Sequence, residues 1–139
     1  MQKPQAHVRV DLSPGCSIGP GKVALLEGIA RSGSLSAAAR GLGMSYRRAW
    51  LLLHNINTSF HEPAAALSAG GKDGGGARLT PFGQQLVESY REFESAVDAL
   101  AVRSFSCIRP NPAAAEGASV SRRPLRRPLP EASASKEED

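Results

Sequence analysis

The stretch SLSAAARGLGMSYRRAW, residues 34–50, decides the fold. Ser34 and Ser45 each stand where a serine caps the amino end of a helix, which predicts two helices in close succession. Between them lie a run of alanines and Gly43, and glycine tolerates the positive backbone φ of a sharp turn. Small alanine side chains also let two helices pack closely at a steep angle. We therefore expect a helix-turn-helix here.

The sequence on either side predicts further elements. Gly33 ends a preceding helix, and Thr80 followed by proline is typical of the start of another. A glycine-rich tip at residues 70–76 predicts a hairpin. The segment SPGCSIGPG is rich in turn-forming residues, and we expect it to be a loop. The expected elements are a strand over residues 7–12, helices over residues 21–32, 35–41 and 46–56, the hairpin, and a long helix over residues 81–103.

This order is that of a winged helix-turn-helix, a mainly α fold with a small β-hairpin and a long C-terminal dimerisation helix. Residues 1–6 are expected to be an N-terminal tail and residues 7–103 the folded domain. Residues 104–139 are rich in Pro, Ala and Arg and contain few large apolar residues, which predicts a disordered tail. Its element RRPLRRPLP is consistent with a polyproline ligand, a basic arm or a merely solvated segment.

Charge is distributed unevenly along the chain, whose formal net charge is +4. Residues 31–78 carry six arginines and lysines against two acidic residues, whereas residues 88–98 carry one arginine against four acidic residues. A basic region beside an acidic one is expected where one face of a protein meets a polyanion and another does not.

The first turn of the helix over residues 46–56 carries the strongest functional signal. Arg47 is our candidate for reading a base, because arginine binds guanine O6 and N7 with two hydrogen bonds. Arg48 is expected to bind phosphate, and Tyr46 to stack or to bond to the DNA backbone. Trp50 suits either packing or DNA contact, and His54 a surface or phosphate contact. An ordinary helical hairpin with a solvated basic end would also show paired arginines.

The glycine-rich tip suggests a second contact. Glycines let a backbone approach a phosphate chain closely, and Lys72 supplies a charge there, so we expect a wing that grazes DNA rather than a loop without function. Arg78, at the base of the hairpin, adds a candidate phosphate contact. The full set of candidate DNA-binding residues is Ser34, Ser45, Tyr46, Arg47, Arg48, Trp50, His54, Lys72 and Arg78.

Other classes of function find little support. The three histidines and two cysteines show no metal-ligand spacing, so we expect no metal and no other cofactor. No catalytic arrangement stands out, and we expect no enzyme. Cys16 and Cys107 are far apart, which favours reduced thiols in a cytoplasmic protein. The sequence has no signal-peptide pattern and no apolar run of membrane-spanning length, so no membrane partner is expected.

At this point the residues resemble a known family. The segments SGSLSAAARGLGMSYRRAW and GGKDGGGARLTPFGQQLV look like the N-terminal DNA-binding domain of ModE-type molybdate-responsive transcription regulators. They are more distantly similar to LysR-type winged helices. The resemblance covers about residues 12–100, and its paired elements, SY-basic-x-AW and a glycine-rich wing followed by LT, are fairly specific.

The resemblance implies a sequence-specific transcriptional regulator that binds a palindromic operator in double-stranded DNA as a homodimer. It also implies dimer contacts from the first and last helices, although an apolar stripe is explained equally by packing within the domain. The candidate dimerisation residues are Leu26, Phe82, Leu86, Tyr90, Phe93, Val97 and Leu100. Members of the family carry C-terminal oxyanion-binding modules, and the Pro-rich sequence after Arg103 has no strand pattern, so direct oxyanion binding is not expected. The alternative is a docking module without specific DNA binding.

Overall fold

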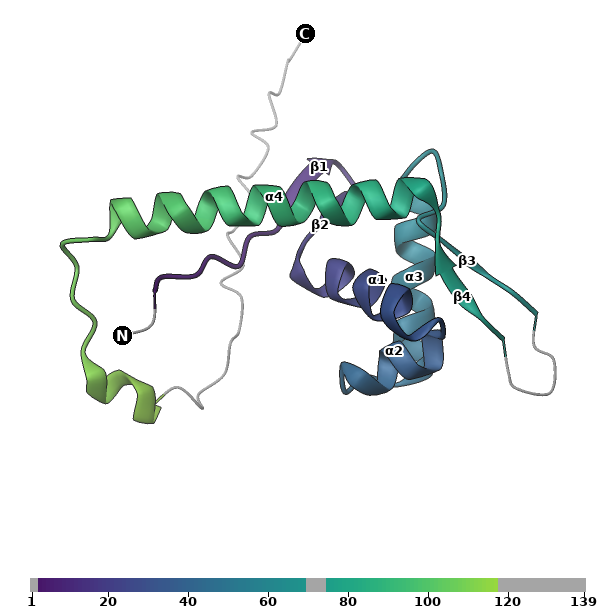
Figure 1. Cartoon of the computed structure of the whole chain (residues 1–139), viewed down its shortest axis with the longest axis horizontal. Helices are drawn as coiled ribbons and strands as arrows, with labels where there is room; N and C mark the ends of the chain where they lie inside the picture. The colour runs from purple at the N-terminus through teal and green to yellow at the C-terminus, as the bar shows by residue number, and fades with distance from the viewer. Residues whose placement is uncertain (1–2, 70–74, 118–139) are drawn as a thin grey trace, which may run out of the picture. The chain divides into compact units, whose positions relative to one another are not determined.

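The computed structural model describes residues 3–69 and 75–117 of the 139-residue chain. The chain divides into two compact units, residues Met1–Cys107 and Ile108–Asp139. In the first unit a long helix runs past three shorter ones, and a β-hairpin lies beside its first turn (Figure 1). This is a mainly α winged helix-turn-helix with a long C-terminal helix, as the sequence predicted.

The first unit begins with a hairpin that the sequence only half predicts. Strands β1 (Val10–Ser13) and β2 (Cys16–Ile18) pair in antiparallel fashion, with Gly15 in the turn at a φ of 77°. The expected strand over residues 7–12 therefore begins later, and the expectation of a loop after it was wrong. The second strand was missed because its three residues lie between turn-forming glycines and prolines, which mask a short extended segment.

Three helices follow at the predicted positions: α1 (Pro20–Ser32), α2 (Leu35–Gly41) and α3 (Tyr46–Ser59). Gly33 adopts a left-handed φ of 69° and its amide donates to the Ile29 carbonyl at 2.8 Å, which ends α1 as expected. The helices enclose one hydrophobic core. Its largest fully buried side chains on these helices are those of Leu25, Leu26, Ile29, Leu53 and Ile56.

Small residues do bring two helices together, although the closest approach lies between α1 and α2. A Cβ placed on Gly28 of α1 would lie 3.1 Å from the Cβ of Ala38 in α2. Ala38 and Ala39 are both buried. The alanine run therefore lets α2 pack against α1, and this packing positions the turn that leads into α3.

The wing is formed by two short antiparallel strands, β3 (Ala65–Leu67) and β4 (Ala77–Leu79). Strand β4 is hydrogen-bonded to the end of α1, because the amide of Ala77 donates to the Gly33 carbonyl at 2.8 Å. Residues 70–74, which include most of the predicted glycine-rich tip, lie outside the described residues.

The long helix α4 (Pro81–Ser104) starts at the predicted cap, where the Thr80 hydroxyl accepts a hydrogen bond of 3.0 Å from the Gly83 amide. Arg91 binds Glu27 of α1 and, at 2.6 Å, Glu94 of its own helix. The contact with Glu27 joins α4 to α1.

The N-terminal segment also contacts α4. The Tyr90 hydroxyl donates to the Val8 carbonyl at 2.8 Å, and the Ala6 amide donates to a carboxylate oxygen of Asp98 at 2.7 Å. Ala6, placed by the sequence in a tail, is therefore bonded to the folded domain.

In the second unit, residues Pro112–Gly117 form a short 3-10 helix, η1. Asn111 stabilises its start, because its side-chain oxygen accepts from the Ala113 amide at 3.0 Å and its carbonyl accepts from the Ala114 amide at 3.0 Å. Local order of this kind was not expected in the predicted tail. Residues 118–139 lie outside the described part of the chain.

Candidate nucleic-acid interface

The two predicted serine caps stabilise the amino ends of α2 and α3. The Ser34 hydroxyl accepts a hydrogen bond from the Ala37 amide at 3.2 Å, and the Ser45 hydroxyl accepts one from the Arg48 amide, also at 3.2 Å. In the turn between the helices, Gly43 has a φ of 66°. Both hydroxyls satisfy amides that the first helical turn leaves without backbone partners.

The first turn of α3 presents its side chains to solvent. Tyr46 is 54% exposed, and Arg47 and Arg48 are both exposed. Within the described residues, neither guanidinium has a hydrogen-bond or ion-pair partner. Cationic side chains without carboxylate partners keep their donors available for an anionic ligand.

Trp50 and His54, one turn apart on α3, stack on each other. Their ring centroids are 5.1 Å apart and their planes differ by 5°. Trp50 remains 42% exposed and His54 is exposed, so neither belongs to the core. Together with Leu67 of β3, they line a shallow hollow between α3 and the wing.

The wing strands lie beside the start of α3. Tyr46 lines a second hollow with Leu67 and Ser68, at the outer end of β3. Arg78 is exposed in the middle of β4. The structure thus places Tyr46 against the wing, and Arg47 and Arg48 follow it in the exposed first turn of α3. Lys72 lies outside the described residues.

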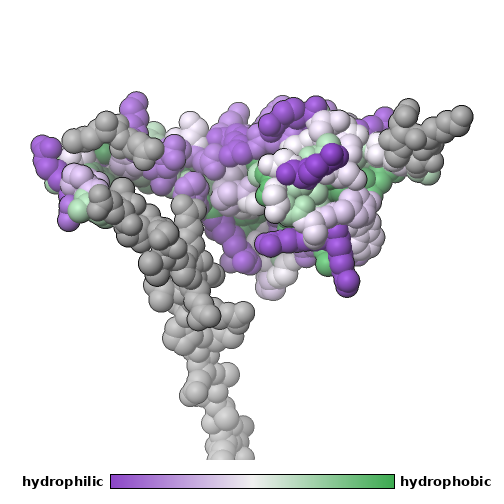
Figure 2. Space-filling view, turned by 90° about the horizontal axis from the view of Figure 1, so that it is seen from below, coloured by the Kyte–Doolittle hydropathy of each residue, from purple (hydrophilic) through white to green (hydrophobic). Residues whose placement is uncertain are grey.

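The exposed cations of this region are not balanced by nearby acids. Every described arginine between residues 31 and 78 is exposed, and Glu62 is the one described acidic residue in that interval. Figure 2, viewed from below Figure 1, shows hydrophilic side chains projecting from the surface among paler and hydrophobic residues. The acidic residues predicted to lie apart are on α4.

The sequence missed the residue that fixes α3 against the wing. The side-chain oxygen of Asn57 accepts hydrogen bonds from the amides of Ala64 at 2.8 Å and Ala65 at 3.2 Å, and its nitrogen donates to the Ala65 carbonyl at 3.0 Å. The only available signal was a polar residue directly beside the buried Ile56.

The candidate dimerisation residues divide into two groups. Leu26 is fully buried and Tyr90 is buried, so their side chains lie inside the domain and we exclude both from a dimer surface. Phe82, Leu86 and Val97 are half-buried. The Phe82 ring packs against that of Phe60, with 5.4 Å between the ring centroids. Phe93 and Leu100 are 40% and 52% exposed.

Three further observations concern other features of the chain. In the described part of the chain, no three His, Cys, Asp or Glu side chains are grouped in a way that holds a metal ion. Both cysteines are free thiols. Among the described helices, none combines the length and the apolar character needed to cross a membrane.

Comparison with known proteins supports the resemblance to ModE-type proteins. The chain is 45% identical over 83 residues to the molybdenum-pterin-binding protein MopB of Rhodobacter capsulatus and 36% identical over 102 residues to the molybdenum transport protein ModE of Azotobacter vinelandii. It is 41% identical over 71 residues to the DNA-binding transcriptional dual regulator ModE of Escherichia coli. The predicted resemblance to ModE-type proteins is therefore confirmed.

These matches cover 60%, 70% and 51% of the chain, in the same order. They cover only 31%, 38% and 27% of the relatives, so the chain spans about a third of the length of the proteins it matches. No protein-family model matches the sequence.

Proposed function

We propose that this protein is a sequence-specific DNA-binding transcriptional regulator. The observation that carries the proposal is the exposure of Arg47 and Arg48, without described partners, in the first turn of α3. A relative that is 41% identical to this chain over 71 residues is named as a DNA-binding regulator. Neither feature calls for catalysis, and we propose no enzymatic activity.

The proposed roles follow from where the described side chains lie, and for Lys72 from the sequence alone. Arg47 reads a base edge in the major groove, and Arg48 binds a phosphate. Tyr46 contacts the backbone from beside the wing. The remaining candidates have supporting roles: Ser34 and Ser45 orient the first amides of their helices toward the DNA, the Trp50–His54 stack contacts the groove wall, and Arg78 and Lys72 bind phosphates from the wing.

We further propose that the regulator is a homodimer on a palindromic operator. On α4 the apolar positions recur at alternating spacings of four and three residues, the pattern of helices that pack on each other. Because Tyr90 is buried inside the domain, the part of this stripe open to a partner consists of Leu86, Phe93, Val97 and Leu100. Phe93 and Leu100 leave much of this stripe uncovered within one chain. A second copy of α4 would cover it.

The names of the relatives suggest the process that the regulator serves. ModE of Azotobacter vinelandii is named for molybdenum transport and MopB of Rhodobacter capsulatus for molybdenum-pterin binding. We propose a role in molybdenum-linked gene control in the cytoplasm, without direct oxyanion binding by the winged helix-turn-helix domain itself.

A fluorescence anisotropy titration tests DNA binding. The full chain is titrated against a labelled duplex from upstream of its own gene and against an unrelated duplex of equal length. We expect tighter binding to the upstream duplex, and weaker binding for Arg47→Ala and Arg48→Ala than for the matched control Arg103→Ala at the end of α4. Equal, salt-insensitive signals for both duplexes would contradict the proposal and favour a docking module.

A further inference from the structure

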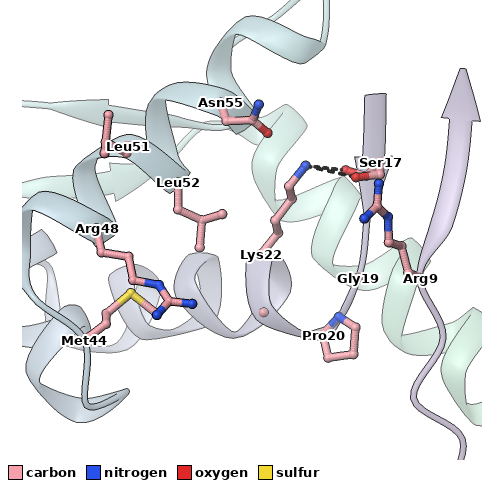
Figure 3. A pocket seen from close by; sticks show the side chains of 11 residues that line it. Arg9, Ser17, Gly19, Pro20, Lys22, Met44, Arg48, Leu51, Leu52 and Asn55 are labelled. Carbon is pink, nitrogen blue, oxygen red and sulfur yellow. Dashed lines mark hydrogen bonds between the residues drawn. The ribbon is translucent and has the colours of Figure 1, made fainter. Parts of the chain in front are cut away.

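A groove runs along the side of α3 that faces away from the wing (Figure 3). It separates α3 from the first turn of α1 and from the β1–β2 hairpin, and it has a volume of about 560 Å³. Of the proposed recognition residues, Arg48 alone lines it. Its lining residues are Arg9, Ser17, Gly19, Pro20, Gly21, Lys22, Met44, Arg48, Leu51, Leu52 and Asn55.

Three cations from separate segments meet around this groove. Arg48 enters from α3, Arg9 from just before β1, and Lys22 from α1 between them (Figure 3). None of the described lining residues is acidic. Asp11 pairs with Nε of Arg9 at 3.0 Å, in a contact that is largely exposed and therefore weak.

Lys22 is held in place at the centre. Its Nζ donates to the Ser17 carbonyl at 2.8 Å and to the Ser17 hydroxyl at 3.3 Å. An ammonium has three N–H donors, so one remains for a ligand. Burial and the neighbouring Arg9 lower the pKa of Lys22, which means that its charge lacks compensation in the present surroundings.

Apart from Ser17 and Asn55, the remaining side chains of the groove are apolar. They are those of Pro20, Met44, Leu51 and Leu52, and Leu51 is largely exposed. Apolar side chains interspersed with cations suit a ligand that alternates carbon-rich and anionic groups. A DNA strand alternates deoxyribose and phosphate in this way.

We propose that this groove binds the sugar–phosphate backbone of DNA, with Lys22 and Arg9 contacting phosphates that the wing does not reach. The inference rests on the proposed function and extends it. Arg48 joins the two surfaces, because it lies in the first turn of α3 and also lines the groove. One side of α3 then carries the wing and the other side this second backbone contact.

The test compares salt dependence of DNA binding for wild type, Arg9→Ala, Lys22→Ala and the charge-matched control Arg103→Ala. Each lost phosphate contact lowers the slope of log K against log salt by about 0.9. We expect this decrease for Arg9→Ala and Lys22→Ala, with unchanged base preference, and a wild-type slope for Arg103→Ala. Ethylation interference should lose a phosphate signal in the same two variants.

Three outcomes would overturn the inference, and they differ from one another. In the first outcome, Arg9→Ala and Lys22→Ala keep the wild-type slope of log K against log salt, while Arg47→Ala binds DNA more weakly than wild type. This result would reject the groove contact and leave the proposed function intact. No DNA binding by the wild type would reject both. In the third outcome, millimolar inorganic phosphate shifts the amide NMR signal of Gly21 in wild type but not in Lys22→Ala, and Lys22→Ala keeps the wild-type salt dependence of DNA binding. This result would assign the groove to a free anion instead. Because Arg9 is exposed, its variant keeps the comparison valid if Lys22→Ala folds poorly.

Discussion

The side chain of Asn57 in α3 pairs with the backbone of Ala65 in β3 as a neighbouring strand would, donating to its carbonyl at 3.0 Å and accepting from its amide at 3.2 Å. The same oxygen also accepts from the Ala64 amide at 2.8 Å. One side chain thus satisfies three buried or half-buried backbone groups at the point where the wing begins. The direction of the wing relative to α3 is fixed by this contact.

Replacing Asn57 with alanine should therefore loosen the wing. The three backbone groups lose their partner, and an unsatisfied buried polar group costs about 1–3 kcal/mol. We expect the free energy of unfolding to fall by an amount in this range in urea titrations. Asn55→Ala on the exposed side of the same helix is the matched control and should change stability little. Equal effects of the two substitutions would contradict the role given to Asn57.

Gly83 should tolerate no side chain. A Cβ at this position would lie 1.9 Å from the Ala64 carbonyl oxygen, so α4 would have to move away from the strand. Gly83→Ala should lower stability by about 1–3 kcal/mol, the usual cost of overpacking. Gly41→Ala is the control, because nothing lies within 4 Å of a Cβ there and the substitution favours the helix. Thermal unfolding of both variants tests this contrast.

Tyr90 predicts how stability changes in alkaline solution. Burial and the nearby Glu94 carboxylate raise the pKa of Tyr90 above its ordinary value of 10.0. Its neutral form is therefore favoured in the folded state, and this contribution is complete below pH 10.0 and is lost as pH rises through the folded-state pKa. The difference in free energy of unfolding between wild type and Tyr90→Phe should shrink as the pH rises above 10.0. A difference that grows instead would contradict the assignment.

The exposed half of the α4 stripe predicts the oligomeric state. Leu100→Glu should convert a dimer to a monomer in sedimentation experiments, because a carboxylate cannot be buried without a partner. Leu100 is 52% exposed in a single chain, so the monomer should stay folded. The control is Ala99→Glu, an exposed position next to the stripe. A Leu100→Glu protein with the mass of the wild type would contradict dimerisation through this face.

Arg47 and Lys72 should differ in how their loss affects recognition. Arg47→Ala is expected to cost about 1–3 kcal/mol of binding and to relax base preference at one position. Lys72→Ala should weaken binding to all sequences alike, because a phosphate contact carries no base information. A panel of duplexes with single base-pair changes separates the two patterns. Uniform weakening by Arg47→Ala would instead assign that residue to the backbone.

The elements that rest on local signals could be predicted from the sequence. The caps at Ser34, Ser45 and Thr80 and the helix end at Gly33 depend on residues close in the chain, and each is found where expected. Strand β2 could not be predicted, because three residues carry too little periodicity.

Contacts between segments that are distant in the chain could not be predicted from the sequence either. The stripe on α4 was visible, but its division into buried Tyr90 and exposed Leu100 depends on where residues 6–18 pack. The groove around Lys22 likewise joins residues that lie far apart in the chain, and only the folded chain brings Arg9 and Arg48 to the same place.

The bonds from Ala6 and Val8 to α4 bear on how a minimal fragment should be designed. A truncation that starts at Val10, the first residue of regular structure, would delete both bonds and leave Tyr90 and Asp98 without these partners. Such a fragment would lose the two bonds that hold the N-terminal segment on α4, so its lower stability would be an artefact of trimming. The shortest version worth producing begins ahead of Ala6.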